Sequence, residues 1–389
     1  MSALAEPSPR RVLSACGSAH ALHDGFTDLL NVLYPLLQTQ FGLSYAAIGA
    51  LKAVYSGAMA SGQIPSSWFS RRLGGVAVLA AGTGLVALGY GLAGLAGSLW
   101  SVTIGLLLAG LGGSTQHPIA STLVSSAYPG ARSRAALGTY NFTGDVGKVA
   151  LPAAFAFIAA TLGWRQALMV TAAAAIASAA VVVAILRPAA TARAPTQVEG
   201  QVRGRDEPWS FWLLFFIHIC DSLVRTGFLI FLPFLLRQKG ADLPAIGLAL
   251  ALLFAGGAAG KLVMGWLGAR LGVVTSVVLT EAATTALIFA LLPLSLNTVP
   301  FLLPLVGLAL NGTSSVLYGT VPEFVVAEKR THAFAIFYTG GSVAGACGPF
   351  LFGLLADVVG LVPTIMVVAS IALVTVPMVW ALRPQFKTG

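Results

Sequence analysis

Long apolar segments without any charged residue constrain this chain more than any other feature. The stretches 76–94, 167–186 and 364–382 contain no Asp, Glu, Lys or Arg. Each is close to the ~20 residues that a helix needs to cross the hydrocarbon of a bilayer. Only 9% of all residues are charged and 57% are hydrophobic, whereas a soluble protein carries roughly 25% charged residues. The sequence therefore predicts an all-α membrane protein.

Hydropathy divides the 389 residues into twelve predicted transmembrane helices. The expected helices are 16–38, 45–68, 75–95, 99–123, 136–160, 164–187, 209–236, 243–267, 272–294, 298–320, 332–357 and 361–382. The one long polar stretch, 188–208, has the composition of a flexible linker. We therefore expect a six-helix bundle over 1–187 and a second six-helix bundle over 209–389.

The two halves of the chain repeat each other at a fixed offset. His20 corresponds to His218 and Pro35 to Pro233, both at a separation of 198 residues (218 − 20 and 233 − 35). Further matches at this offset are 47–49 with 245–247, 72–74 with 270–272, 140 with 338, and 147 with 345. Parallel repeats of this kind build transporters with a substrate site near the bilayer midplane, at the repeat interface.

Loop charge predicts the orientation of the chain. Lys and Arg concentrate in alternate loops, and only Arg165, Arg237 and Lys239 lie in the loops of the other side. The positive-inside rule then places both termini in the cytoplasm of a bacterium, with the helices in its inner membrane. The loops that set the orientation of the chain account for most of the net charge of +9. The excess of basic residues therefore does not indicate nucleic-acid binding.

Helix 1 carries ionisable residues on one face. His20, Asp24 and Asp28 follow one another at intervals of four residues, and Asn31 lies on the same face. Ionisable groups at membrane depth are expensive, so they usually face a cavity and serve a substrate or proton path. We therefore predict that Asp24, Asp28 and His20 take part in proton coupling. The alternative is that the carboxylates only pair with a neighbouring helix.

Helices 4 and 5 supply further candidates. Asp145 and Lys148 lie on one face of helix 5 and could neutralise each other. Alternatively, Asp145 joins the proton-coupling residues, and Lys148 binds an anionic substrate or pairs with the carboxylates of helix 1. His117 precedes Pro118, which breaks a local hydrogen bond and favours a kink. We predict substrate contact for Lys148 and His117.

The second half has its own polar residues. Helix 7 carries His218, Asp221 and Arg225, and the permanently charged arginine needs a counter-ion or an anionic ligand. A permanent Asp221–Arg225 pair within the helix is one possibility, and substrate binding or gating is the other. Helix 10 adds a neutral stripe at Asn311, Ser314 and Tyr318. We predict substrate contact for these residues of helices 7 and 10, together with Asn31 of helix 1.

The chain resembles the major facilitator superfamily along almost its whole length. That family carries the loop signature Gly-x-x-x-Asp-Arg-x-Gly, and residues 265–272 read GWLGARLG while residues 67–74 read SWFSRRLG. Within the family, the chain is similar to the fosmidomycin-resistance group of exporters. That likeness rests on His20-x-x-x-Asp24, on Tyr-Pro-Leu-Leu-Gln at 34–38, and on Gly-Ser-x-x-His-Pro at 113–118. The resemblance implies alternating access by two helical bundles.

These observations predict a monomeric, proton-coupled secondary transporter that exports a small polar or anionic compound by antiport. The alternative within transport is a proton-coupled importer, or symporter, of a small organic anion. An intramembrane enzyme is a third alternative, against which the internal repeat argues. The sequence has no phosphate-binding loop of the GxxxxGK[ST] type and no Cys/His cluster with metal-ligand spacing. We therefore expect no catalytic residues, no cofactor and no bound metal.

Overall fold

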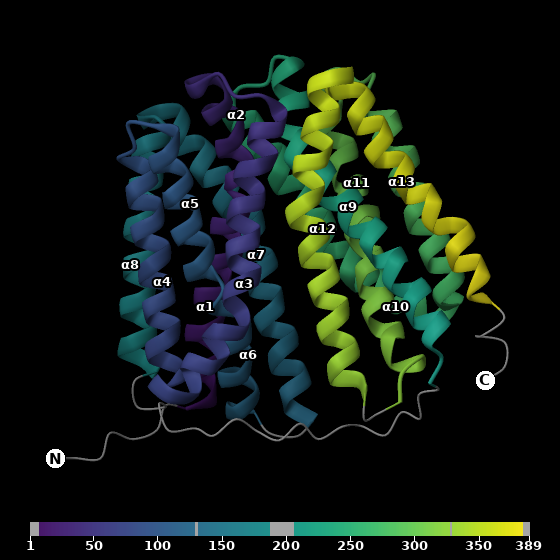
Figure 1. Ribbon diagram of the computed structural model, residues 1–389, viewed down its shortest axis with the longest axis horizontal. Helices are drawn as coiled ribbons and strands as arrows, with labels where there is room; N and C mark the ends of the chain where they lie inside the picture. Colours follow the sequence, from purple (N-terminus) through teal and green to yellow (C-terminus); the bar gives the residue numbers. More distant parts are fainter. Residues whose placement is uncertain (1–7, 129–130, 187–205, 327–328, 384–389) are drawn as a thin grey trace. The chain divides into compact units, whose positions relative to one another are not determined.

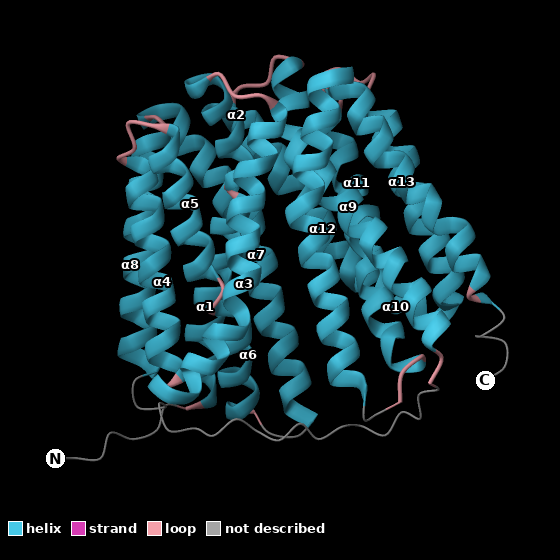
Figure 2. Ribbon diagram, in the orientation of Figure 1, coloured by secondary structure: helices cyan, strands magenta, loops and turns pink. Residues whose placement is uncertain are grey.

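The computed structural model describes residues 8–128, 131–186, 206–326 and 329–383. Within these ranges the secondary structure is helical and no strand occurs (Figures 1 and 2). The chain forms two compact units: unit 1 comprises Met1–Phe41 and Val54–Val198, and unit 2 comprises Gly42–Ala53 and Glu199–Gly389. Most of the linker expected over 188–208 lies outside the described residues.

Unit 1 is a bundle in which α1 packs against α6, α7 and α8, while α4 packs against α5 and α8. The first part of α3, through Ala53, is grouped with unit 2. The helices of this half of the chain are α1 (Pro9–Asp28), α2 (Leu30–Phe41), α3 (Tyr45–Leu73), α4 (Gly75–Gly94), α5 (Leu99–Gly113), α6 (Gln116–Ala127), α7 (Ala131–Leu162) and α8 (Trp164–Leu186).

Unit 2 is a second helical bundle. Within it, α9 packs against α12 and α13, and α10 packs against α11 and α13. Its elements are α9 (Pro208–Gln238), α10 (Leu243–Leu291), α11 (Val299–Thr320), the short 3₁₀ helix η2 (Val321–Glu323), α12 (Arg330–Val359) and α13 (Leu361–Ala381).

The thirteen α-helices of the described residues correspond to the twelve predicted segments. The pair α1 and α2 makes one segment, the pair α5 and α6 makes another, and α10 contains two. Gly272 separates the two parts of α10, because its φ of 77° and ψ of 164° are not helical; a residue without Cβ takes such a positive φ at little cost. The predicted all-α, twelve-helix membrane fold is confirmed.

The break between α5 and α6 has an identifiable cause. Pro118 has no N–H, and its ring crowds the carbonyl of the residue four positions earlier, Ser114. The helix accordingly ends at Gly113 and resumes at Gln116. A side chain of another helix meets the Ser114 carbonyl, because the Ser66 hydroxyl of α3 donates a hydrogen bond to it at 3.4 Å. The kink that the sequence predicts at Pro118 is therefore present.

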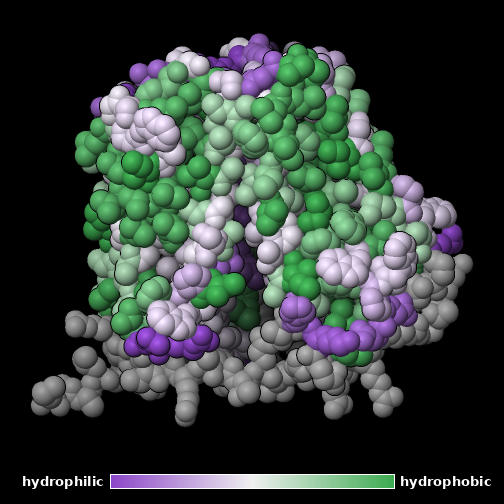
Figure 3. Space-filling view, in the orientation of Figure 1, coloured by the Kyte–Doolittle hydropathy of each residue, from purple (hydrophilic) through white to green (hydrophobic). Residues whose placement is uncertain are grey.

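The surface of the molecule suits a lipid environment. Hydrophobic side chains cover most of the visible face, and hydrophilic ones gather toward its two ends (Figure 3). Nine helical segments of the described residues are long and apolar enough to cross a membrane. Arginine guanidinium groups lie over tryptophan rings at corresponding places in the repeats, Arg72 over Trp68 at 4.1 Å and Arg270 over Trp266 at 3.9 Å. Aromatic and basic side chains of this kind anchor helix ends at the membrane interface.

Candidate functional site

Two glycines of α7 allow this helix to approach α1 closely. A Cβ on Gly147 would lie 1.8 Å from the carbonyl oxygen of Ala21, and a Cβ on Gly144 would lie 2.6 Å from Oδ2 of Asp24. Only glycine therefore permits this spacing of the two helices. The close approach places Lys148, the residue after Gly147, beside the polar face of α1.

Asp24 is the centre of a charged cluster in unit 1. Its Oδ2 lies 3.2 Å from Nζ of Lys148, and its Oδ1 lies 3.3 Å from Nε2 of His20 and 3.7 Å from Nε2 of His117. Asp24 is 7% exposed. Burying a carboxylate without a partner costs several kcal/mol, so these basic neighbours are what keep the aspartate in the protein interior.

The orientation of the His20 ring determines where its protons lie. Nδ1 is 2.8 Å from the main-chain carbonyl oxygen of Tyr140, and the ring stacks on the Tyr140 ring at 4.1 Å. A carbonyl oxygen only accepts hydrogen bonds, so Nδ1 carries the hydrogen and donates it. In a neutral ring Nε2 would then present a lone pair to Asp24 Oδ1, and two acceptors at 3.3 Å repel. A proton on either Nε2 or the carboxyl group removes this repulsion.

The C-terminal end of α1 continues the polar face. The Asn31 amide donates to the carbonyl oxygen of Asp28 at 3.1 Å and to its Oδ1 at 3.3 Å. The Thr27 hydroxyl is 3.0 Å from that of Tyr55 on α3. Asp28 and Asn31 thus form one local pair, and Asp28 interacts electrostatically with Lys148 as well. The predicted residues of helix 1 therefore belong to one connected polar region.

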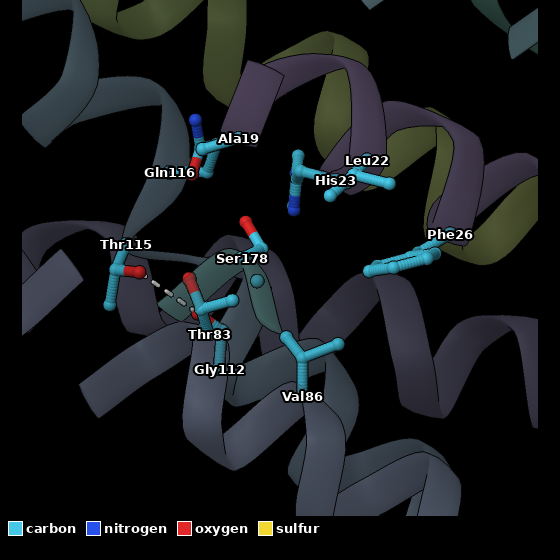
Figure 4. Close-up of a pocket in the computed structure, with 11 residues that line it drawn as sticks. Ala19, Leu22, His23, Phe26, Thr83, Val86, Gly112, Thr115, Gln116 and Ser178 are labelled. Carbon is cyan, nitrogen blue, oxygen red and sulfur yellow. Dashed lines mark hydrogen bonds between the residues drawn. The ribbon is translucent and has the colours of Figure 1, made fainter. Parts of the chain in front are cut away.

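A small cavity adjoins this cluster (Figure 4). Its volume of about 10 Å³ is enough for a single water molecule. His23 and Ser178 point into it, and Gln116 and Thr115 lie on its wall. The His23 ring also meets the edge of the His117 ring at a centroid distance of 5.1 Å. Since His117 is the more exposed ring, with 45% of its side chain accessible, the two histidines connect the buried cavity with the more open side of the cluster.

Unit 2 holds a second polar group on α9. Nε2 of His218 is 3.4 Å from the Tyr318 hydroxyl, and the ring stacks on Phe337 at 4.2 Å. Nη2 of Arg225 is 3.5 Å from the Ser222 hydroxyl. Within the described residues no ion pair links Asp221 to Arg225, and Oδ2 of Asp221 has no hydrogen-bond partner. The possible intrahelical pair is therefore not formed.

The polar residues predicted on helix 10 form hydrogen bonds within their own helix. Asn311 donates to the Gly307 carbonyl at 3.1 Å, and Ser314 donates to the Asn311 carbonyl at 3.1 Å, so both bond to their own helix. Asp145 interacts electrostatically with Lys148, which lies three residues further along α7. The predicted roles of all these residues stay predictions.

The buried residues Glu281 and His23 are absent from the set of predicted site residues. Both lie in predicted membrane spans, and an ionisable residue at membrane depth is itself a signal of function. His23 lies on the same face of helix 1 as His20 and Asp24, so spacing could have marked it, whereas Glu281 is an isolated charge in its segment. Which groups lie beside them becomes visible only when the packing of the helices is known.

His20, Asp24 and His117 also have the composition of a metal site. One ligand atom from each lies within 4.8 Å of the other two. The Lys148 ammonium group, 3.2 Å from the same carboxylate, would repel a divalent cation placed there. The geometry therefore suits a proton and a permanent cation better than a metal, and the prediction that no metal is bound stays a prediction.

The fold and this buried charge define the chain as a membrane transporter of the two-repeat type. A family model described as the Major Facilitator Superfamily matches residues 17–213 and 214–389. The chain therefore belongs to the Major Facilitator Superfamily. Membership of the fosmidomycin-resistance group, by contrast, stays a resemblance. A curated relative, the probable sulfoacetate transporter SauU of Cupriavidus necator, is 24% identical over 361 residues, which cover 85% of this chain and 83% of the relative.

Solved structures share the fold. A bacterial homologue of the human lysosomal transporter Spinster superposes with a TM-score of 0.83 at 17% identity, covering 98% of both chains. The peptide transporter POT in complex with sulfate gives 0.80 at 13% identity, covering 97% of this chain and 95% of that one. A point mutant of the nucleoside transporter NupG gives 0.77 at 13% identity, covering 95% and 99%. At these identities the likeness concerns the fold alone. That the chain is a transporter follows from its membership of the Major Facilitator Superfamily.

Proposed function

We propose that the chain is a proton-coupled symporter of a small organic anion in the bacterial inner membrane. The observation that carries the proposal is the contact between His20 and Asp24. Since Nδ1 of His20 donates to the Tyr140 carbonyl, the 3.3 Å contact of Nε2 with Asp24 is favourable only with a proton on one of the two groups. This buried pair therefore has the chemistry of a proton-coupling site.

The pairing of Lys148 explains why a proton and an anion bind together. An ionised Asp24 carboxylate forms an ion pair with the Lys148 ammonium group, at 3.2 Å. A protonated Asp24 releases that ammonium, which then attracts an anionic substrate. His117 lies 3.7 Å from the same carboxylate and offers a second donor. Proton and anion thus favour the same state of the site, and by linkage each strengthens the binding of the other.

The relative in Cupriavidus necator supports an anionic substrate. It is named a probable sulfoacetate transporter, and sulfoacetate is a small compound with a sulfonate and a carboxylate group. In this proposal Lys148 and His117 bind one acidic group. The remaining predicted substrate residues keep their predicted part in substrate contact. Those residues are Asn31, His218, Asp221, Arg225, Asn311, Ser314 and Tyr318. The carrier works as a monomer with both termini in the cytoplasm, and alternating access carries proton and anion across together.

Export by proton antiport is the second candidate function. The similarity of His20-x-x-x-Asp24 and of residues 113–118 to the fosmidomycin-resistance exporters favours it. In antiport the substrate binds when Asp24 has lost its proton. The two functions therefore predict opposite proton movements, and one assay separates them.

The test uses the purified full chain in liposomes that contain a pH-sensitive dye. Sulfoacetate is added outside in radiolabelled form, so substrate and proton fluxes are measured together. Symport predicts labelled uptake with acidification of the lumen, and antiport predicts alkalinisation. Uptake that neither acidifies the lumen nor responds to an imposed pH gradient would refute proton coupling.

A pair of variants, one at His20 and one at Asp24, identifies the coupling site. In His20→Asn the shorter side chain retains a donor for the Tyr140 carbonyl but loses Nε2, so the protein folds and proton-driven uptake disappears. In Asp24→Asn the titratable carboxyl group is removed, and we expect the same loss of pH dependence. A control at Arg165→Lys changes a basic side chain that bonds the Ala96 carbonyl and leaves coupling intact. Wild-type pH dependence in Asp24→Asn would show that the proton binds elsewhere.

A further inference from the structure

The small cavity of unit 1 has buried polar groups on its wall that lack a partner in the protein. Figure 4 shows a ring nitrogen of His23 and the hydroxyl of Ser178 pointing into the cavity, and each residue is only 7% exposed. Among the described residues, neither the His23 ring nor the Ser178 hydroxyl has a hydrogen-bond partner. A buried polar group without a partner costs free energy, so we expect a partner inside the cavity.

Two further hydroxyl groups on the wall can only accept. The Thr83 hydroxyl donates to the Leu79 carbonyl at 2.9 Å. The Thr115 hydroxyl donates to the Gly112 carbonyl at 3.0 Å. Because each hydroxyl uses its one hydrogen in this way, both oxygens offer an acceptor to a molecule in the cavity. The Ser178 hydroxyl still has its hydrogen to donate, so the wall presents donors and acceptors together.

This mixture fits water better than an ion. A metal ion is bound by acceptors alone, and an anion by donors alone. None of the described residues that line the cavity is Asp, Glu, Lys or Arg. A water molecule can donate to the Thr83 and Thr115 oxygens and accept from Ser178, which leaves one position for the His23 ring. The cavity volume of about 10 Å³ suits one such molecule, and polar cavities of this size hold water.

Packing leaves the His23 ring little freedom to turn toward another partner. A Cβ on Gly113 of α5 would lie 2.9 Å from Cε1 of the ring, so only glycine allows α5 to come this close. The ring also meets the edge of the His117 ring, with a centroid distance of 5.1 Å and an angle of 85° between the planes. The partner of the inward-pointing nitrogen therefore has to lie in the cavity.

We propose that unit 1 binds one water molecule in this cavity, between α1, α4, α5 and α8, and that the water is the hydrogen-bond partner of His23, Ser178, Thr83 and Thr115. None of these four residues is among the predicted coupling or substrate residues. The site requires neither substrate nor a gradient. Its part in transport rests on the proposed function, in which the water fixes the orientation of the histidine beside His117.

Solid-state nuclear magnetic resonance of the full chain in lipid bilayers tests the site. Magnetisation is transferred from water protons to the nitrogen-15-labelled histidine rings, and the loss of a signal in His23→Asn assigns that residue. We expect the His23 ring to receive water magnetisation as fast as His117, whose side chain is 45% exposed. Nδ1 of His20, which bonds a main-chain carbonyl, is the internal control and should be several-fold slower. Transfer to His23 as slow as to this nitrogen would overturn the proposal.

Matched variants on α8 show whether that water lies in the cavity. Ser178→Val removes the hydroxyl and puts a methyl group in the space, so we expect the transfer to His23 to fall several-fold. Thr171→Val is the control, because Thr171 is also 7% exposed and its hydroxyl bonds the Ala167 carbonyl of its own helix. This control should leave the transfer to His23 unchanged. A fall of equal size in both variants contradicts the proposal.

A variant on α4 keeps the test decisive if Ser178→Val does not fold. Thr83→Val retains the shape of threonine but removes one acceptor for the water, so it should also slow the transfer to His23. Unchanged transfer in Thr83→Val, or in folded Ser178→Val, would show that water reaches His23 by another route and would refute the site. These spectra need neither sulfoacetate nor a gradient, so they stand even if symport is refuted.

Discussion

Removing the cation beside Asp24 should destabilise the protein in a pH-dependent way. Lys148→Met leaves a carboxylate that is 7% exposed without the ammonium group at 3.2 Å. Loss of one partner from a buried ion pair costs about 3–5 kcal/mol. The Lys148 side chain is 28% exposed, and His20 and His117 remain as partial replacements. We therefore expect a loss of about 2–3 kcal/mol in the free energy of unfolding at neutral pH.

The loss in the free energy of unfolding arises because the buried Asp24 carboxylate has no cation beside it. The loss should therefore vanish when the charge of Asp24 is removed. In the Asp24→Asn background Lys148→Met leaves no carboxylate unpaired. The double-mutant cycle should therefore give a coupling free energy of about 2 kcal/mol between Asp24 and Lys148. Acid pH has the same effect, since a protonated Asp24 needs no cation. The penalty of Lys148→Met is thus largest at neutral pH and declines as the pH falls.

The measurement is reversible unfolding of the purified chain in mixed micelles, followed by tryptophan fluorescence and circular dichroism. Lys148→Arg is the matched control, because it keeps a cation in reach of Asp24 and should lose little stability. If Lys148→Met costs the same amount in the Asp24→Asn background as in the wild type, the loss comes from packing and the electrostatic reasoning is wrong.

Three further predictions concern the scaffold. Gly147→Ala should lose about 1–3 kcal/mol, because its Cβ would lie 1.8 Å from a carbonyl oxygen of α1. Gly138→Ala on the same helix is its control and should be tolerated, since no atom lies within 4 Å; equal effects in the two unfolding curves would contradict the close approach. Asp242→Ala should lose about 1 kcal/mol, since Asp242 caps α10 by accepting from the Ala245 N–H at 2.8 Å; Asp242→Ser should restore it. Tyr90→Phe should cost about 1 kcal/mol, because the buried hydroxyl donates to a main-chain carbonyl of α1; unchanged unfolding would show that this bond contributes nothing.

The twelve helices could be predicted because hydropathy and the repeat at an offset of 198 residues are both properties of the linear sequence. The sequence also indicates the break at Pro118, since the missing N–H of proline is a local property. The break after Asp28 in the first segment is less visible. Pro35 lies several residues beyond it, and the spacing of apolar residues continues through both parts.

Partners across helices could not be predicted, because spacing along one helix does not show which helices are neighbours. Lys148 could pair within α7 with Asp145 or across to helix 1, and only the packing of α7 on α1 brings it to Asp24. For Arg225, spacing permitted Asp221, but the guanidinium approaches Ser222 instead. An i, i+4 spacing allows an ion pair; rotamers and neighbouring helices determine whether it forms.

The two repeats keep a common scaffold and differ in their charges. His20 and His218, equivalent at the offset of 198 residues, each stack on an aromatic ring, at 4.1 Å on Tyr140 and at 4.2 Å on Phe337. Around the first histidine the Asp24 carboxylate pairs with Lys148, whereas on the helix of the second histidine Arg225 approaches the Ser222 hydroxyl. Transporters of peptides and nucleosides have the same fold at 13% identity, so the fold cannot determine the substrate. The proposed function assigns substrate selection to the buried charges, so the cation at Lys148 is where a change of substrate class should first be measured.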